Sequence, residues 1–154
     1  MLGYSARFQG RNERATRYFA GSAGIDVPAG TYSAHRSVEA RAVFEQGERS
    51  RAFRMLRDHA DRLLDTNYVD DARLVAVEFV NMMAELGRLE EAARVLAYLE
   101  TTGGFGELAR ETLVAEAVSK VAANPRVTED GGRDLDARQA LAYMREVLDE
   151  LAGP

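Results

Sequence analysis

The chain of 154 residues has no cysteine and no tryptophan, few prolines, and Lys120 as its only lysine. Without cysteine there are no disulfides, thiolate metal sites or cysteine nucleophiles, which fits a cytoplasmic protein. Its apolar runs fall far short of the ~20 residues that span a bilayer, and the first residues, MLGYSARFQGR, lack the apolar core of a signal peptide. We therefore expect a cytoplasmic protein that does not cross a membrane.

Charge is distributed unevenly along the chain. The formal net charge is −5, but residues 1–60 contain 10 Arg against 6 acidic residues, a balance of +4, and the remainder carries −9. Such asymmetry is one mark of a partner surface, although arginine on exposed helical faces is also ordinary solvation.

A short pattern of residues occurs four times in the sequence. Each copy starts with Gly, has Ala five residues later and has Phe or Leu four residues after that. The copies start at Gly10, Gly47, Gly87 and Gly132. Ala at the fifth position would let paired helices approach closely, and the Phe or Leu would fill the space beside them, so the pattern describes packing.

Apolar residues recur at helical spacing on both sides of these glycines, and no segment alternates as a strand would. The sequence therefore predicts an all-α fold in which tight turns at Gly10, Gly47 and Gly87 each join two antiparallel helices, while the loop NPRVTEDGG separates the first helix of the fourth copy from Gly132 and favours a capping helix pair there. We expect one domain over 1–154 with seven to eight helices. The expected units are hairpins near 2–22, 34–64 and 70–100, followed by a C-terminal helix pair over 106–152 whose first helix covers roughly 106–123.

The Gly-to-Gly intervals of 37, 40 and 45 residues are typical of helical-hairpin repeats. The first copy resembles the tetratricopeptide repeat: Leu2 and Gly3 match the Leu-Gly pair, Gly10 the turn, and Ala15 and Phe19 the small and large packing positions. Ala40 and Val80 replace the helix glycine in the next two copies. The resemblance implies a short superhelical array whose first helices line a concave groove that binds a peptide or partner domain.

A second resemblance rests on the run ARLVAVEFVNMMAELGRLEEAARVLAYLETTGGFG. It is similar to C-terminal helical regions of actinobacterial ATPase regulators of the LuxR type. That likeness implies an alternative function, a regulatory or scaffold segment of a larger ATPase or transcriptional regulator.

Patterns that carry chemistry are weak in this sequence. The two histidines, His35 and His59, lack the spacing of metal ligands, and we expect both at the surface or the edge of the core. No Gly-x-Ser-x-Gly elbow occurs, and TTGGFGE lacks the lysine and preceding strand of a phosphate loop. We therefore predict no catalytic residues, no metal and no cofactor, and a protein that is not an enzyme.

A third possible function is nucleic-acid binding through a basic face. Arginines of the second helices in the first two copies would form that face. Interrupting acidic residues and a pI of about 5.1 weigh against it. The set is Arg11, Arg14, Arg17, Arg49, Arg51, Arg54 and Arg57.

The preferred hypothesis is a non-catalytic module that binds another protein through the groove of the first helices. Arginine and asparagine there would hold a carboxylate or peptide backbone, and aromatic rings would supply apolar area. The predicted partner-binding residues are Tyr4, Arg7, Phe8, Arg41, Phe44, Glu45, Asn81 and Glu85.

The start of the chain suggests a further partner. Terminal repeats normally carry a polar outer face, yet Leu2, Tyr4 and Phe8 open inside the first repeat. We expect this N-terminal half-helix to be covered by a second copy in a homodimer or by upstream repeats.

Overall fold

The computed structural model describes residues 29–103, 105–124, 127 and 132–153, with side chains from His35 onward. Within these residues the structure has seven α-helices, one short 3-10 helix and no strand, which confirms the all-α prediction for this part of the chain. The elements are α3 (Ala29–Glu45), α4 (Arg49–Asp65), η1 (Val69–Asp71), α5 (Ala72–Glu85), α6 (Leu89–Glu100), α7 (Glu107–Leu113), α8 (Ala115–Ala122) and α9 (Ala137–Ala152). The expected hairpin near 2–22, with Gly10, lies outside the described residues.

Gly47 and Gly87 end α3 and α5 in the same way. Their φ values of 92° and 78° are left-handed, a conformation that glycine adopts without steric cost. The residue after each glycine donates its N–H back to the helix, Glu48 to Val43 O at 3.3 Å and Arg88 to Met83 O at 2.9 Å. The next helix begins two residues after each glycine, so both predicted hairpin turns are present.

Asn67 ends α4 in the same way, through a left-handed backbone conformation. Its φ is 59°, and the N–H of Tyr68 donates to Leu63 O at 3.0 Å. Asparagine is one of the few residues besides glycine that tolerates this conformation. Residues with left-handed backbone thus end three of the four helices of the two hairpins, α3, α4 and α5, at even spacing in the chain.

The predicted fourth copy does not share this turn. Gly132 has no positive φ, and α9 begins only at Ala137, capped by Asp136, whose carboxylate accepts from the N–H of Gln139 at 2.7 Å. Gly132 instead packs against α6, where an added Cβ would lie 2.1 Å from Arg94 O. Glycine is required there for the close approach of two backbones, and this copy of the pattern does not mark a hairpin turn.

The C-terminal region also differs from the expected helix pair. The helix predicted over roughly 106–123 is two helices, α7 and α8, separated at Val114, whose backbone angles are φ −134° and ψ 19°. The region 106–152 therefore contains three helices, and the prediction of a pair is wrong.

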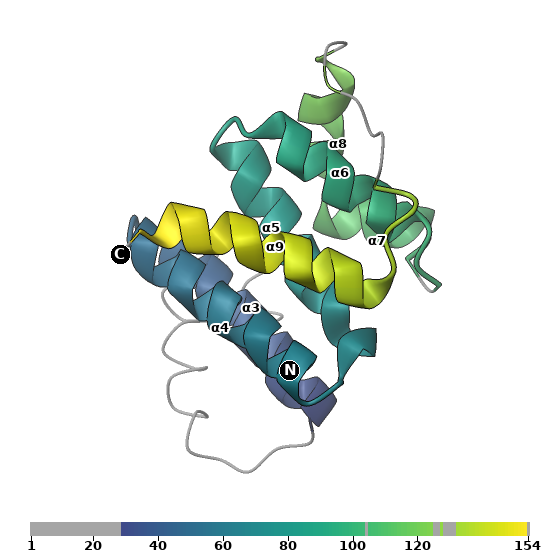
Figure 1. Cartoon of the computed structure of the whole chain (residues 1–154). Helices are drawn as coiled ribbons and strands as arrows, with labels where there is room; N and C mark the ends of the chain where they lie inside the picture. Colours follow the sequence, from purple (N-terminus) through teal and green to yellow (C-terminus); the bar gives the residue numbers. More distant parts are fainter. Residues whose placement is uncertain (1–28, 104, 125–126, 128–131, 154) are drawn as a thin grey trace.

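Packing joins the two hairpins and then closes them with α9. The helices α3 and α4 pack together, as do α5 and α6, while the first helices α3, α5 and α8 contact in succession. The last helix then returns to α4, its most extensive neighbour, and also contacts α5 (Figure 1). A linear repeat array contacts only adjacent units. The described helices therefore form a hairpin pair closed by a distant helix, around a core that includes Leu56, Phe79, Leu96, Leu141 and Met144.

Candidate functional site

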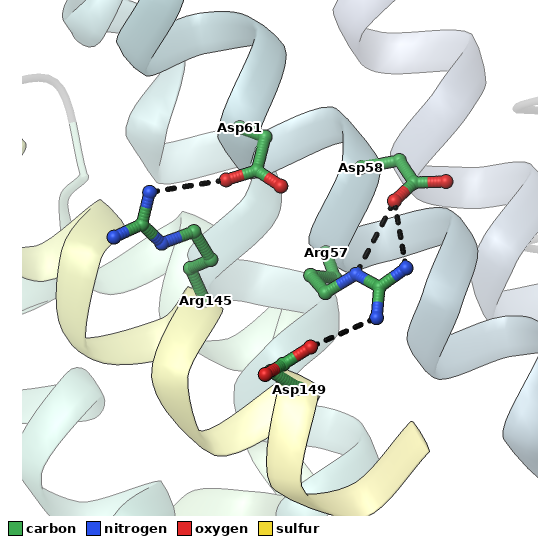
Figure 2. A network of polar contacts seen from close by, with 5 residues as sticks. All are labelled: Arg57, Asp58, Asp61, Arg145 and Asp149. Atoms are coloured by element: carbon green, nitrogen blue, oxygen red, sulfur yellow. Dashed lines mark hydrogen bonds and ion pairs between the residues drawn. The ribbon is translucent and has the colours of Figure 1, made fainter. Parts of the chain in front are cut away.

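Polar side chains join α4 and α9 in an antiparallel register. Arg57 Nη1 donates to Asp149 Oδ1 at 2.9 Å, and one turn further along α4 Arg145 Nη1 donates to Asp61 Oδ1 at 3.2 Å (Figure 2). These two contacts place a basic and an acidic residue in alternation on each helix. The surface between α4 and α9 thus carries both signs of charge in a fixed pattern.

The register extends beyond the ion pairs to the end of α4. Arg138 Nη2, in the first turn of α9, donates to Asn67 Oδ1 at 2.6 Å. The residue that ends α4 therefore also holds the start of α9, which aligns the two helices along their lengths.

A groove of about 780 Å³ follows this seam. Its floor includes Ala142 and Tyr143, and the Tyr143 ring is covered on one side by the guanidinium of Arg94, 4.9 Å from the ring centre. The groove is lined by Arg57, Asp61, Gln139, Ala142, Tyr143, Arg145, Glu146 and Asp149. We call these eight residues the α4–α9 groove.

Two groups in the α4–α9 groove have shifted pKa values. The hydrogen bonds that Arg57 donates to Asp58 raise the pKa of its guanidinium, with a further contribution from Asp149. Burial raises the pKa of the Tyr143 phenol. Arginine and tyrosine are protonated at neutral pH even without these shifts, so the groove presents a cation at Arg57 and a neutral hydroxyl at Tyr143.

The structure brings most of the predicted partner-binding residues of α3 and α5 together, but they bind one another. Arg41 Nη2 donates to Glu85 Oε2 at 2.6 Å, and Arg41 Nε lies 3.1 Å from Glu45 Oε1. The guanidinium also lies over Phe44, 5.1 Å from the ring centre. Arg41 is 9% exposed and Phe44 is 2% exposed. The cation and ring expected to meet a partner are thus held inside the chain.

Asn81 is also engaged within the chain. Its Nδ2 donates to Leu113 O at 2.9 Å, the type of backbone contact that the sequence predicts for a bound peptide. The cleft beside Arg41, Asn81 and Glu85 measures about 20 Å³. A cavity needs roughly 10–15 Å³ to hold one water, so this cleft has room for about one water and none for a peptide segment. The remaining predicted residues, Tyr4, Arg7 and Phe8, and with them the expected dimer surface, lie outside the described residues.

His59 is buried, which corrects the expectation that it lies at the surface or core edge. It is 3% exposed, and its Nδ1 lies 3.1 Å from the hydroxyl of Ser37, itself 1% exposed. Burial, followed by the charges of Arg36 and Arg62, lowers the pKa of His59 to about 4. Because no substrate reaches so deeply buried a hydroxyl, this Ser–His contact links α3 to α4 and does not form a nucleophile. Helical periodicity could have located His59, since it lies three residues after Leu56 and four before Leu63 on the apolar face.

The arginines considered for nucleic acid have carboxylates among them on α4. Arg51 pairs with Glu48 at 3.1 Å, and Arg57 pairs with Asp58 and Asp149. Arg49 lies over Phe44, 5.6 Å from the ring centre. Part of this predicted basic face is therefore neutralised locally, and Arg11, Arg14 and Arg17 lie outside the described residues.

Among the residues that the structure describes, no three or more His, Asp or Glu side chains gather as metal ligands. None of the described helices is long and apolar enough to cross a membrane. Comparison of the chain with protein-family models, with curated proteins and with solved structures finds no match. The geometry of the chain itself is therefore what a functional proposal can rest on.

Proposed function

We propose that this chain is a non-catalytic module that binds another protein through the α4–α9 groove. The observation that carries the proposal is the contrast between the two surfaces described above. The groove between α4 and α9 is about 780 Å³, whereas the cleft at the first helices is about 20 Å³. The charged groups of both surfaces are paired within the chain, but only those of α4 and α9 line a space large enough for a partner segment.

The pattern of the groove specifies the kind of segment that fits it. Arg57 and Asp61 are one helical turn apart on α4, as are Arg145 and Asp149 on α9, which separates opposite charges by about 6 Å along each wall. A partner helix that carries acidic and basic residues one turn apart, beside a narrow apolar stripe, complements both walls. Ala142 and Tyr143 would receive the stripe. Fixed charge patterns of this sort contribute to specificity and orientation more than to affinity.

The proposal is tested by reversing the pattern while preserving the fold. The double variant Asp61→Arg, Arg145→Asp keeps an ion pair between α4 and α9 but presents opposite signs to a partner. We expect it to melt a few degrees below the wild type at most, because the like charges that it places one turn apart on each helix cost only tenths of a kcal/mol, and to lose at least tenfold in affinity for a partner captured from the source cells by the wild type. Isothermal titration with the purified partner measures the change.

A matched control reverses a pair elsewhere on the surface. Glu116 and Lys120 form an exposed ion pair within α8 at 3.2 Å, outside the α4–α9 groove. The variant Glu116→Lys, Lys120→Glu should bind the partner as the wild type does. The proposal fails if the groove variant binds with unchanged affinity, or if both swaps weaken binding equally.

A further inference from the structure

The break between α7 and α8 has only a weak local cause in the sequence, a hydrogen bond that Thr112 Oγ1 donates to Leu108 O at 2.7 Å, which by itself bends a helix slightly. Residues 107–122, ELARETLVAEAVSKVA, contain neither glycine nor proline and are rich in Ala, Leu and Glu, which favour helix. Sharp breaks in helices usually arise at proline, at glycine, or where a side chain inserts into the backbone ladder. The first two are absent here and the Thr112 bond is a weak cause, so we infer that a contact from elsewhere in the fold contributes to the break.

Asn81 of α5 makes such a contact. Val114 N–H still donates to Arg110 O at 3.1 Å, and Val118 N–H donates to Val114 O at 2.9 Å. Between these bonds the helical pattern is interrupted at Val114, which frees the Leu113 carbonyl from its usual partner four residues ahead. The amide of Asn81 donates to that carbonyl at 2.9 Å, and the Val114 side chain is buried beside it at 1% exposure.

The helix on the far side of the break is held lightly. None of the side chains of α7 is buried, and its extensive contacts are with α8. An ion pair ties it to α6, with Arg110 Nη2 at 2.9 Å from Glu100 Oε1. Leu108 is 77% exposed, the most exposed large apolar side chain of the described residues. Besides the Arg110 ion pair, Ala109 and Leu113 pack partly buried against the core, so a change in the direction of α7 would disturb three of its seven side chains.

We propose that the Asn81 amide is a latch that keeps α7 and α8 apart, and that its release from Leu113 joins residues 107–122 into one continuous helix. Joining restores the backbone bonds that the break removes and changes where Leu108 points. The local sequence favours the joined form, and Asn81 together with the buried Val114 favours the broken form. This balance makes the segment a two-state element with a single polar contact at its control point.

Helix geometry gives the two states different lengths. In a continuous helix the Cα atoms of Leu108 and Ala122 are 14 residues apart, which corresponds to about 21 Å at 1.5 Å per residue, and a bend at Val114 shortens this distance. Both residues are exposed. Because the chain has no cysteine, the double variant Leu108→Cys, Ala122→Cys accepts spin labels at these two sites alone. Double electron–electron resonance then measures the distance in the full chain, after correction for the label linkers.

In the labelled wild type we expect a main distance shorter than that of the continuous helix. Adding Asn81→Leu, which cannot donate to Leu113, should raise the ratio of the joined to the broken form roughly tenfold, as expected for loss of one buried hydrogen bond. Asn81→Asp also removes the donor at nearly the same size and adds a negative charge that repels the Leu113 carbonyl, so it repeats the test if the Leu variant folds poorly. Arg73→Gln, an exposed change on the same helix, is the control and should leave the distances unchanged.

Hydrogen exchange provides a second readout. The amides of Ala115, Glu116 and Ala117 have their helical acceptors only in the joined form, so they should exchange fast in the wild type and more slowly in both Asn81 variants. The proposal is overturned if the wild type already shows the continuous-helix distance. It is also overturned if neither Asn81 variant differs from Arg73→Gln in distance and exchange.

Discussion

The buried His59 makes the stability of the fold depend on pH in a direction that the structure specifies. In the native protein its pKa is lowered to about 4, whereas the ordinary value of 6.5 applies when the chain is unfolded. Below pH 6.5 the unfolded chain therefore binds a proton that the native chain does not, and the free energy of unfolding falls until the native imidazole itself titrates near pH 4. The stabilisation is complete above pH 6.5 and is lost progressively between pH 6.5 and 4.

The size of this effect follows from the difference between the two pKa values. Each pKa unit corresponds to about 1.4 kcal/mol, so at pH 4.5 the contribution lost is about 2–3 kcal/mol. The carboxylates of the chain titrate in the same range, and a comparison with His59→Gln removes their effect because both proteins share them. Urea unfolding at pH 7.5 and 4.5 should show that the wild type loses about 2–3 kcal/mol more than the variant. Equal losses in the two proteins would refute the burial of an uncharged His59 as the cause.

Three further predictions concern packing and capping. Gly132→Ala should destabilise the fold by about 1–3 kcal/mol, because the added Cβ would lie 2.1 Å from Arg94 O. The control Gly103→Ala, whose Cβ meets nothing within 4 Å, should leave the thermal midpoint nearly unchanged. Equal shifts in the two variants would contradict the close approach of Gly132 to α6. Ala92→Leu should cost about 1–3 kcal/mol by overpacking a fully buried site. Ala137→Leu, at the half-buried equivalent position of α9, should cost less in the same melting assay, and similar costs would mean that both positions pack alike. Asp136→Ala should cost about 1 kcal/mol in urea unfolding through loss of the α9 capping box, and an unchanged midpoint would contradict that cap.

Residues that end a helix locally explain why the two central hairpins could be predicted from the sequence. Gly47 and Gly87 adopt the left-handed conformation that ends a helix, and Ala52 and Ala92 are fully buried where each hairpin packs. These features depend on residues within a few positions of one another. Asn67 ends α4 by the same mechanism but carries no glycine, so the even spacing of the three helix ends was less visible than the pattern of glycines.

Contacts between distant residues explain what the sequence could not show. The return of α9 to α4 joins positions 92 residues apart through Arg57 and Asp149, and no local pattern encodes that distance. At the break before α8, the Leu113 carbonyl likewise accepts from Asn81, which is 32 residues away in the chain. Contacts of the same kind occupy the residues predicted to bind a partner. The side chains of Arg41 and Asn81 do hold a carboxylate and a backbone carbonyl, as the sequence predicts, but these groups belong to Glu85 and Leu113 of the same chain.

The proposed function is tested most directly by finding which surface a partner touches. Glu146 lines the α4–α9 groove, while Glu90 is an exposed glutamate of the same type on α6 that does not line it. A photo-cross-linking amino acid can replace either one in the full chain, expressed in its source cells. The account predicts a discrete covalent adduct to a second protein from position 146 and none of comparable yield from position 90. Adducts of equal yield from both positions, or an adduct from position 90 alone, would contradict it.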